Sequence, residues 1–279
     1  MKWRGRRASA NVEDQRGKGG IAIVGGSFGL VIIIILALLG GNPGEFFNST
    51  QVAPTGNTIP YEETDEEKEL SEFVSVVLAD TEDVWTELFN EQGMVYKKPT
   101  LVLFTDSVQS ACGTAGAAVG PFYCPGNYKL YIDLNFFGEL RDQLNAPGDF
   151  AMAYIIAHEV GHHVQTLLGI NEEINALRPK LSETDFNKYS VRLELQADYF
   201  AGVWGYHAKK TGLLEVGDLE EALHAASAIG DDNIQLETQG YIVPESFTHG
   251  TSEQRVRWFS KGFQTGSING GDTFSANDL

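Results

Sequence analysis

The sequence predicts an α+β protein, mostly helical with a small β-sheet, preceded by one transmembrane helix. Several segments repeat apolar side chains every three or four residues, which is typical of helices that bury one face. Two short runs, residues 100–104 and 129–134, are instead rich in residues that favour strands. Residues 21–41 contain no charged side chain, and about 20 such residues cross a bilayer as a helix.

Charge and composition divide the chain into four parts. Residues 1–20 carry six basic and two acidic side chains, and residues 21–41 form the predicted transmembrane helix. Residues 42–65 are rich in Gly, Pro, Asn, Thr and Glu, which predicts a flexible linker. Residues 66–279 are long enough for one folded domain with a full-sized core.

The basic N-terminus predicts the orientation in the membrane. The positive-inside rule keeps residues 1–20 in the cytoplasm and places the domain outside it, as a single-pass protein of the cell membrane. A cleaved signal peptide is the alternative, but the apolar run is long for one and no A-x-A cleavage site follows it.

The acidic balance of the chain excludes one class of partner. The net charge is −18, and the chain without its basic N-terminus carries −22. No basic face is available to neutralise phosphates, so we expect no nucleic-acid partner. The same charge disfavours contact between the domain and an anionic membrane surface.

Apolar periodicity gives the helices of the domain in chain order. They are predicted over residues 66–90, 136–144, 149–168, 186–209, 218–229 and 252–263. In the first of them Leu70, Phe73 and Val77 share one face. The two predicted strands lie between the first helix and the second, and the Gly-rich residues 113–120 between those strands are expected to be flexible.

A motif of two histidines and a glutamate lies in the helix predicted over residues 149–168. His158 and His162 are one turn apart, so both imidazoles lie on one face, where they can bind one tetrahedral Zn²⁺. Glu159 lies just off that face and can take the proton of a water on the metal. His and Glu also occur on ordinary surface helices, but apolar residues flank this motif. On a buried helix an unpaired polar cluster would be costly, and a metal would satisfy it.

A catalytic zinc site needs a third protein ligand and one open position. The extended motif H-E-x-x-H-x-x-G-x-x-H fails, because Gln165 and Leu168 stand at its last two required positions. Glu194 and Asp198 instead share one face of the helix predicted over residues 186–209. We expect Glu194 to be the third ligand and Asp198 to accept the other ring N–H of a ligand histidine. A solvated polar face is the alternative, but that helix is largely apolar. Weaker glutamate candidates in the connection between the two helices are Glu172, Glu173 and Glu183.

The chain contains two cysteines, Cys112 and Cys124, whose spacing is too wide for a C-x₂₋₄-C zinc knuckle. With the domain outside the cytoplasm, we expect a disulfide that closes the Gly-rich stretch between them. A loop of this size would gain about 3 kcal/mol from the bond. Two free thiols are the alternative.

Five segments carry a resemblance to a known family: Cys112–Pro125, Ala157–Gln165, Arg192–Asp198, Gly217–Leu223 and Phe247–Ser252. They resemble the bacterial putative neutral zinc metallopeptidase family, and the resemblance covers nearly all of the chain up to Phe274. It implies a zinc peptidase-like site. Members often carry two further cysteines where this chain has Tyr199 and Gly271, which implies that a second disulfide has been lost here.

The end of the chain resembles, more distantly, membrane gluzincins whose last helix begins with a T-H-P motif and carries an arginine. Thr248, His249 and Arg255 are similar. The resemblance implies that His249 stabilises the tetrahedral intermediate and that Arg255, or Arg257, supports the metal site from outside the ligands. The alternative for His249 is a loop residue that caps the next helix.

These features together predict a zincin-like metallopeptidase domain and a membrane-anchored, extracytoplasmic zinc endopeptidase of the gluzincin kind. His158, His162 and Glu194 would hold Zn²⁺, and Glu159 would act as general base on the attacking water, with a peptide or protein as substrate. In zincin-like folds a strand beside the metal helix pairs with an extended substrate. The strand over residues 129–134, or the Gly-rich stretch before it, is the candidate, and an ordinary sheet strand is the alternative.

Two other functions are compatible with the same residues. One is a catalytically silent zinc-binding scaffold or assembly factor at the membrane. An intact Glu159 favours the enzyme, because a scaffold needs only the metal ligands. The other is a structural zinc with no open position, which a set of two histidines and one glutamate disfavours relative to cysteines.

Overall fold

The computed structural model of the chain describes residues 1–17 and 61–279. The predicted transmembrane helix, residues 21–41, lies outside these ranges, as does most of the predicted linker. Neither described range contains a helix with the length and apolar character that crossing a bilayer requires.

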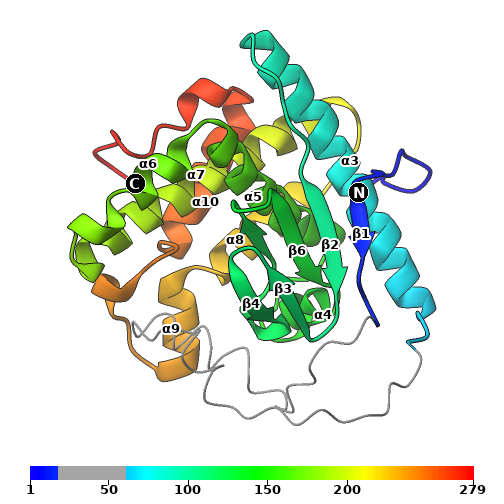
Figure 1. Ribbon diagram of the computed structural model, residues 1–279, viewed down its shortest axis with the longest axis horizontal. Coiled ribbons are helices and arrows are strands. Elements are labelled where there is room, and N and C mark those ends of the chain that lie inside the picture. Colours follow the sequence, from blue (N-terminus) through cyan, green and yellow to red (C-terminus); the bar gives the residue numbers. More distant parts are fainter. Residues whose placement is uncertain (18–60) are drawn as a thin grey trace.

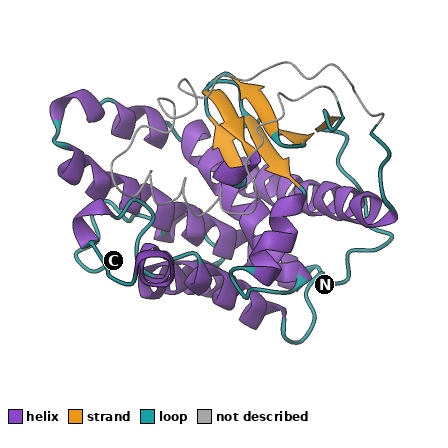
Figure 2. Cartoon of the chain, turned by 90° about the horizontal axis from the view of Figure 1, so that it is seen from below, coloured by secondary structure: helices purple, strands orange, loops and turns teal. Residues whose placement is uncertain are grey.

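Long helices form the body of the protein, and a small sheet covers one side of them (Figure 1, Figure 2). The helices are α3 (Asp65–Glu91), α4 (Asn135–Asp142), α5 (Asp149–Leu167), α6 (Ile170–Asn175), α7 (Glu183–Lys210), α8 (Asp218–Ala228), α9 (Asp231–Gln239) and α10 (Ser252–Thr265). The six predicted helices are confirmed, while α6 and α9 have no predicted counterpart. The α+β class, mostly helical with a small sheet, is therefore confirmed.

Polar caps fix where the long helices begin. Thr64 accepts a hydrogen bond from the backbone N–H of Glu67, and the Glu67 carboxylate accepts one from the backbone N–H of Thr64. Thr251 and Gln254 form the same capping box at the start of α10. Each box satisfies N–H groups that the first turn of a helix leaves without a partner.

The sheet has four strands in the order β1-β2-β6-β5. They are β1 (Val12–Asp14), β2 (Thr100–Phe104), β5 (Phe122–Cys124) and β6 (Lys129–Asp133), and β3 (Ser107–Ser110) and β4 (Gly113–Gly116) form a separate hairpin. β1, β2 and β6 run parallel, and β5 runs antiparallel to β6. The strands predicted over residues 100–104 and 129–134 are confirmed. Residues 113–120, which we expected to be flexible, supply β4 and a short 3₁₀ turn.

β6 lies inside the sheet: it pairs with β2 over Lys129–Asp133 and with β5 over Lys129–Tyr131. The prediction that residues 129–134 pair with a substrate is therefore wrong for Lys129–Tyr131, which have strand partners on both edges. β5 is the outer strand on this side of the sheet and contacts α5. It has no predicted counterpart, because three residues are too few to give an alternating pattern in the sequence.

Residues 1–17 belong to the same folded body as the rest of the described chain. β1 pairs in parallel with β2, so that Val12 lies opposite Leu101. The indole of Trp3 is buried and meets the ring of Phe73 edge-on, with 5.5 Å between the centroids. The N-terminal segment thus contributes both a strand and a core side chain.

This pairing corrects the predicted division of the chain. A segment that supplies β1 is no separate arm, so the division between residues 1–20 and a domain that starts at residue 66 is wrong. The predicted topology is incompatible with the pairing as well, because a cytoplasmic N-terminus cannot hydrogen-bond to a strand outside the cytoplasm.

The two described ranges also meet where they end. Arg16 Nη2 lies 2.6 Å from Glu63 Oε1, and the Arg16 guanidinium lies over the ring of Tyr61.

A buried carboxylate on α3 binds the N-terminal segment. Glu82 accepts hydrogen bonds from Ser9 Oγ at 2.6 Å and Asn11 Nδ2 at 2.7 Å. Two cations approach the same carboxylate, Lys98 Nζ at 3.1 Å and Arg7 Nη1 at 3.4 Å. Burial raises the pKa of Glu82, but the hydrogen bonds from Ser9, Asn11 and Lys98 outweigh it and hold the pKa below its usual range. The carboxylate is therefore charged while the N-terminal segment is docked on α3.

Replacing Glu82 by glutamine should loosen this segment. The Glu82→Gln change turns one acceptor oxygen into a donor that faces other donors, so the free energy of unfolding should fall by about 1–3 kcal/mol. Hydrogen exchange at the β1 amides should become faster at the same time. Glu87→Gln, at an exposed position of the same helix, is the control. Equal stability and equal exchange in the two variants would contradict the role of Glu82.

Candidate metal centre

The candidate site lies where the backbones of α5 and α7 approach each other closely. Gly161 permits this approach, because a Cβ atom there would lie only 2.8 Å from the backbone oxygen of Ala197. A side chain at this position would push apart the two helices that carry His158 and Glu194.

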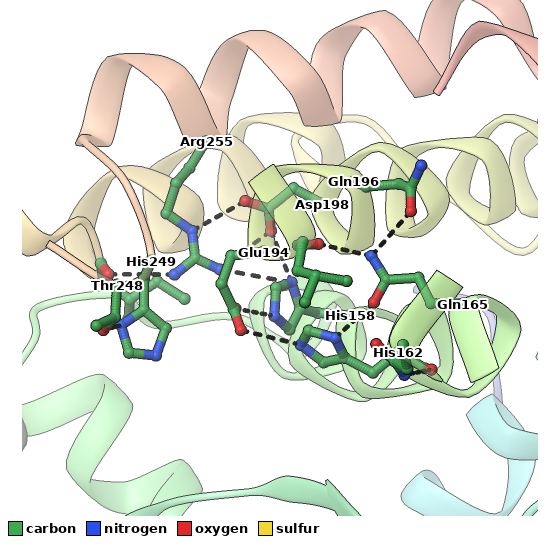
Figure 3. Close-up of polar contacts among 12 residues, drawn as sticks. His158, His162, Gln165, Glu194, Gln196, Asp198, Thr248, His249 and Arg255 are labelled. Atoms are coloured by element: carbon green, nitrogen blue, oxygen red, sulfur yellow. Dashed lines mark hydrogen bonds and ion pairs between the residues drawn. The ribbon is translucent and has the colours of Figure 1, made fainter. Parts of the chain in front are cut away.

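Two histidines and one glutamate converge beside this crossing (Figure 3). Nε2 of His158 lies 3.1 Å from Oε2 of Glu194, and Nε2 of His162 lies 3.4 Å from Oε1 of the same carboxylate. One ligand atom from each residue lies within 4.8 Å of the other two. Ligand atoms bound at about 2.0–2.1 Å around a tetrahedral ion are about 3.3 Å apart, so this donor set fits Zn²⁺.

A buried carboxylate holds His158 from behind. Nδ1 of His158 lies 2.7 Å from Oδ1 of Asp198, so Nδ1 carries the proton and Nε2 is left for a metal. Asp198 also accepts hydrogen bonds from the Tyr154 hydroxyl at 2.6 Å and from Arg255 Nε at 2.9 Å. Burial raises the pKa of Asp198, but the charge of Arg255 and the hydrogen bonds from His158 and Arg255 outweigh it and lower the pKa. The carboxylate therefore stays ionised, and Arg255 balances its charge.

Only one of the two arginines considered from the sequence lies at the site. Arg255 is buried on α10, and its Nη2 lies 3.0 Å from Oδ1 of Asp198. Arg257 is exposed and pairs with Glu253 at 2.8 Å and Asp278 at 3.0 Å. Arg257 therefore has no contact with the ligand residues in the structure.

Glu159 lies beside the three ligand residues but is not one of their group. Its side chain is buried, and this burial raises its pKa. The charges of His162 and His158 act in the opposite direction, as does a hydrogen bond from the backbone of Tyr123 in β5. The carboxyl group thus lies next to the candidate metal-binding face formed by His158, His162 and Glu194.

His249 lies on the loop before α10, and Glu194 stands between it and the two ligand histidines in Figure 3. Its Nδ1 lies 3.2 Å from Oδ1 of Asp231 and 3.0 Å from Oγ1 of Thr248. Partial desolvation lowers the pKa of His249, but the carboxylates of Asp231 and Glu194 outweigh this effect and raise the pKa. The side chain is 46 % exposed, so the loop that carries it does not enclose the ring.

Asp231, which the sequence analysis does not single out, builds the loop that carries His249. Its Oδ2 accepts hydrogen bonds from the backbone N–H groups of Thr248 at 2.8 Å, His249 at 2.7 Å and Gly250 at 2.9 Å. In the sequence Asp231 looks like any acidic residue at the start of a helix. The N-cap of α10 is Thr251, so His249 is not the capping residue.

The weaker glutamate candidates are not part of the ligand group. Glu172 and Glu173 lie on α6, and Glu183 begins α7. None of them belongs to the group formed by His158 and its partners.

A second group of three carboxylates lies beside the ammonium of Met1. It consists of Asp149, Asp218 and Glu221. The ammonium of Met1 lies 2.8 Å from Asp149 Oδ2 and 3.5 Å from Asp218 Oδ2.

Cys112 and Cys124 form a disulfide, as the sequence predicts. The bond joins the turn between β3 and β4 to the last residue of β5. The preceding residue, Tyr123, places its hydroxyl 3.0 Å from Nδ1 of His163, and Nε2 of His163 lies 2.6 Å from the backbone oxygen of Lys97. Burial lowers the pKa of His163 to about 4, so this histidine is neutral and holds β5 against α5.

The two positions where the resembling family often has cysteines are neighbours. A Cβ atom at Gly271 would lie 2.6 Å from Cδ1 of Tyr199. The ring of Tyr199 therefore fills the space that a second disulfide would occupy.

Comparison with known proteins agrees with the site. A family model described as putative neutral zinc metallopeptidase matches residues 1–274, and the match includes the segment that supplies β1. The uncharacterized protein YpfJ of Escherichia coli (strain K12) is 45 % identical over 278 residues, which are 95 % of this chain and 96 % of that protein. The uncharacterized protein Rv2575 of Mycobacterium tuberculosis is 45 % identical over 195 residues, which are 66 % of this chain and 65 % of that protein. No solved structure matches the chain.

Glu194 should be required for metal binding. Glu194→Ala removes one of the three converging ligands, so the dissociation constant for Zn²⁺ should rise by more than the roughly 100-fold that loss of a supporting residue costs. Glu172→Ala removes an exposed glutamate from α6 and should leave the affinity unchanged. The measurement is a competition titration against a chromophoric chelator. Equal affinities in the two variants would remove Glu194 from the ligand set.

Proposed function

The chain belongs to the putative neutral zinc metallopeptidase family, and from this premise we propose that it is a zinc-dependent endopeptidase. The observation that carries the proposal is the convergence of His158, His162 and Glu194, with Glu159 next to them and free of the ligand group. Two neutral imidazoles and one carboxylate would fill three of the four positions of a tetrahedral ion. The fourth would stay open for water or substrate, as a catalytic site requires. When bound, Zn²⁺ would lower the pKa of a water molecule towards 7 and polarise the scissile carbonyl.

Glu159 supplies the proton transfers of the proposed reaction. Its carboxylate accepts a proton from the attacking water and later gives a proton to the leaving amine. Its buried position supports this role, because burial raises the pKa of a carboxyl group towards the range where a single group can both take and return a proton.

His249 and Arg255 have different tasks in this proposal. His249 donates a hydrogen bond to the oxygen that becomes negative as water adds to the carbonyl, and its nearness to the carboxylates of Asp231 and Glu194 favours its protonated form. Arg255 contacts Asp198 and Tyr154 rather than the ligand atoms, so it acts by holding the carboxylate behind His158.

The proposed substrate is an extended peptide that pairs with β5. Among the described residues β5 pairs with β6 on one edge only, and it contacts the helix that carries Glu159. An edge strand can offer backbone donors and acceptors to a peptide, although the backbone N–H of Tyr123 is already bonded to Glu159. The Cys112–Cys124 disulfide restrains this strand.

A catalytically silent scaffold is the second candidate function. It would use the same three ligands to stabilise the fold at a membrane. The retained carboxyl of Glu159, buried and outside the ligand group, favours the enzyme, since a scaffold has no need of it.

We also propose that residues 1–17 and 61–279 share one oxidising compartment outside the cytoplasm, attached to the membrane through residues 21–41. The pairing of β1 with β2 supports a common compartment, and the disulfide supports an oxidising one. The uncharged apolar run supports attachment to a bilayer without crossing it, since both flanking ranges lie on one side.

Glu159→Gln should separate chemistry from metal binding. The amide cannot accept a proton, so the turnover number on a peptide should fall by about 100-fold to 10,000-fold. Zinc content, measured by elemental analysis after dialysis, should stay at the wild-type level. Full turnover in zinc-loaded Glu159→Gln protein would exclude Glu159 as general base.

Surface labelling tests the common compartment. Lys2 and Lys210 are both exposed, one in the N-terminal segment and one at the end of α7. A membrane-impermeant amine reagent added to intact spheroplasts should modify both, as mapped by mass spectrometry, and a cytoplasmic marker protein should stay unmodified. Modification of Lys210 without Lys2, with both modified after lysis, would contradict the proposal.

A further inference from the structure

A buried amide holds the second ligand histidine. Nδ1 of His162 lies 2.9 Å from Oε1 of Gln165, which is three residues further along α5 and has no solvent exposure. Nε2 of Gln165 donates to the backbone oxygen of Leu193 at 2.6 Å and to Oε1 of Gln196 at 3.1 Å. Gln196, also buried, donates through its Nε2 to the backbone oxygen of Gly271 at 2.8 Å. Figure 3 shows both glutamines beside the ligand group.

The two backbone oxygens give this chain of hydrogen bonds a single direction. The oxygen of Gly271 can only accept, so the amide nitrogen of Gln196 has to face it, and the amide oxygen of Gln196 then faces Gln165. The amide oxygen of Gln196 and the backbone oxygen of Leu193 are both acceptors, so the amide nitrogen of Gln165 faces them on α7. The amide oxygen of Gln165 then faces His162. An oxygen in that position accepts only from a protonated Nδ1.

We propose that Gln165 and Gln196 are positioning residues that fix His162 with its proton on Nδ1, and that the C-terminal segment around Gly271 sets their orientation. This inference rests on the proposed zinc site. The inference means that Nε2 of His162 faces Glu194 already in the metal-free protein, because Nδ1 is hydrogen-bonded to Gln165.

The position of Gln165 requires an amide. His162 needs an acceptor there, whereas the backbone oxygen of Leu193 needs a donor. A carboxylate would leave that oxygen without its donor and would add a buried charge. By contrast, Asp198 behind His158 has Arg255 as a counter-charge. The two ligand histidines are thus oriented by different means, one by a neutral amide and one by an ion pair.

The segment after α10 is attached to α7 on both sides of Gln196. Thr273 Oγ1 donates to the backbone oxygen of Arg192 at 2.7 Å, and the Arg192 guanidinium donates to the backbone oxygen of Thr273. On the other side, the ring of Tyr199 packs against Gly271. Because these contacts hold the Gly271 oxygen in place, a change in this segment should reach His162 without altering any metal ligand.

Three variants and two controls test the proposal on the full chain. Gln165→Met and Gln196→Met keep a long unbranched side chain but remove the hydrogen bonds. Gly271→Ala puts a Cβ atom into contact with the Tyr199 ring. It should therefore displace the backbone oxygen of residue 271, which accepts the hydrogen bond from Gln196. Gln143→Met, at an exposed site, and Gly138→Ala, where a Cβ meets no atom within 4 Å, are the matched controls.

The first readout is the Zn²⁺ dissociation constant from chelator competition, with circular dichroism as a check on folding. We expect Gln165→Met to weaken binding by about 10-fold to 100-fold, the usual effect of losing a partner of a ligand histidine. Gln196→Met and Gly271→Ala should weaken binding less, because Gln165 keeps its bond to Leu193. The two controls should bind zinc as the wild type does.

The second readout needs no variant that has to fold. Imidazole ¹⁵N spectra of the zinc-loaded wild type should show His162 with a protonated Nδ1 and a metal-bound Nε2. A metal-bound Nδ1, or wild-type affinity in both folded glutamine variants, would overturn the proposal while leaving the zinc site in place. A wild-type protein that binds no zinc would instead refute the proposed function.

Discussion

The close approach of α5 and α7 at Gly161 and Ala197 is the constraint on which the site depends. Two helices that touch through their backbones bring side chains of both to one point, so His158 and Glu194 meet although many residues separate them. α10 packs against α7 in the same way, because a Cβ atom at Gly262 would lie 2.0 Å from the backbone oxygen of Tyr199. Arg255 reaches Asp198 because of this second contact. The site is therefore a product of helix packing, and the sheet adds β5 beside it.

The parts of the structure that follow from local pattern could be predicted from the sequence. Apolar periodicity predicts the long helices, and the face shared by Glu194 and Asp198 follows from helical spacing alone. The parts that depend on distant partners could not. Asp231 and Gln165 have ordinary local contexts, and their importance comes from backbone groups that tertiary packing brings to them. β5 is too short to carry a pattern, so the sequence does not show that a further strand pairs with β6.

The N-terminal segment shows how one charge pattern can have two meanings. Its arginines satisfy the positive-inside rule, which depends on composition only. In the structure the same side chains face acidic groups, as Arg7 does with Asp83 at 2.7 Å and Arg16 with Glu63 at 2.6 Å. A basic N-terminal segment is a natural partner for a body of net charge −22, since it offsets part of the repulsion among the acidic residues. Parallel pairing between segments so far apart in sequence has no local signature, so charge alone could not reveal it.

The central claim is that two imidazoles and one carboxylate hold a zinc ion with one position left open. X-ray absorption at the zinc edge of the purified, zinc-loaded full chain tests this claim most directly. The account predicts four light-atom neighbours at about 2.0–2.1 Å, with the outer scattering of two imidazoles and none from sulfur. A spectrum with sulfur neighbours, with a third imidazole, or with six oxygen neighbours would contradict it.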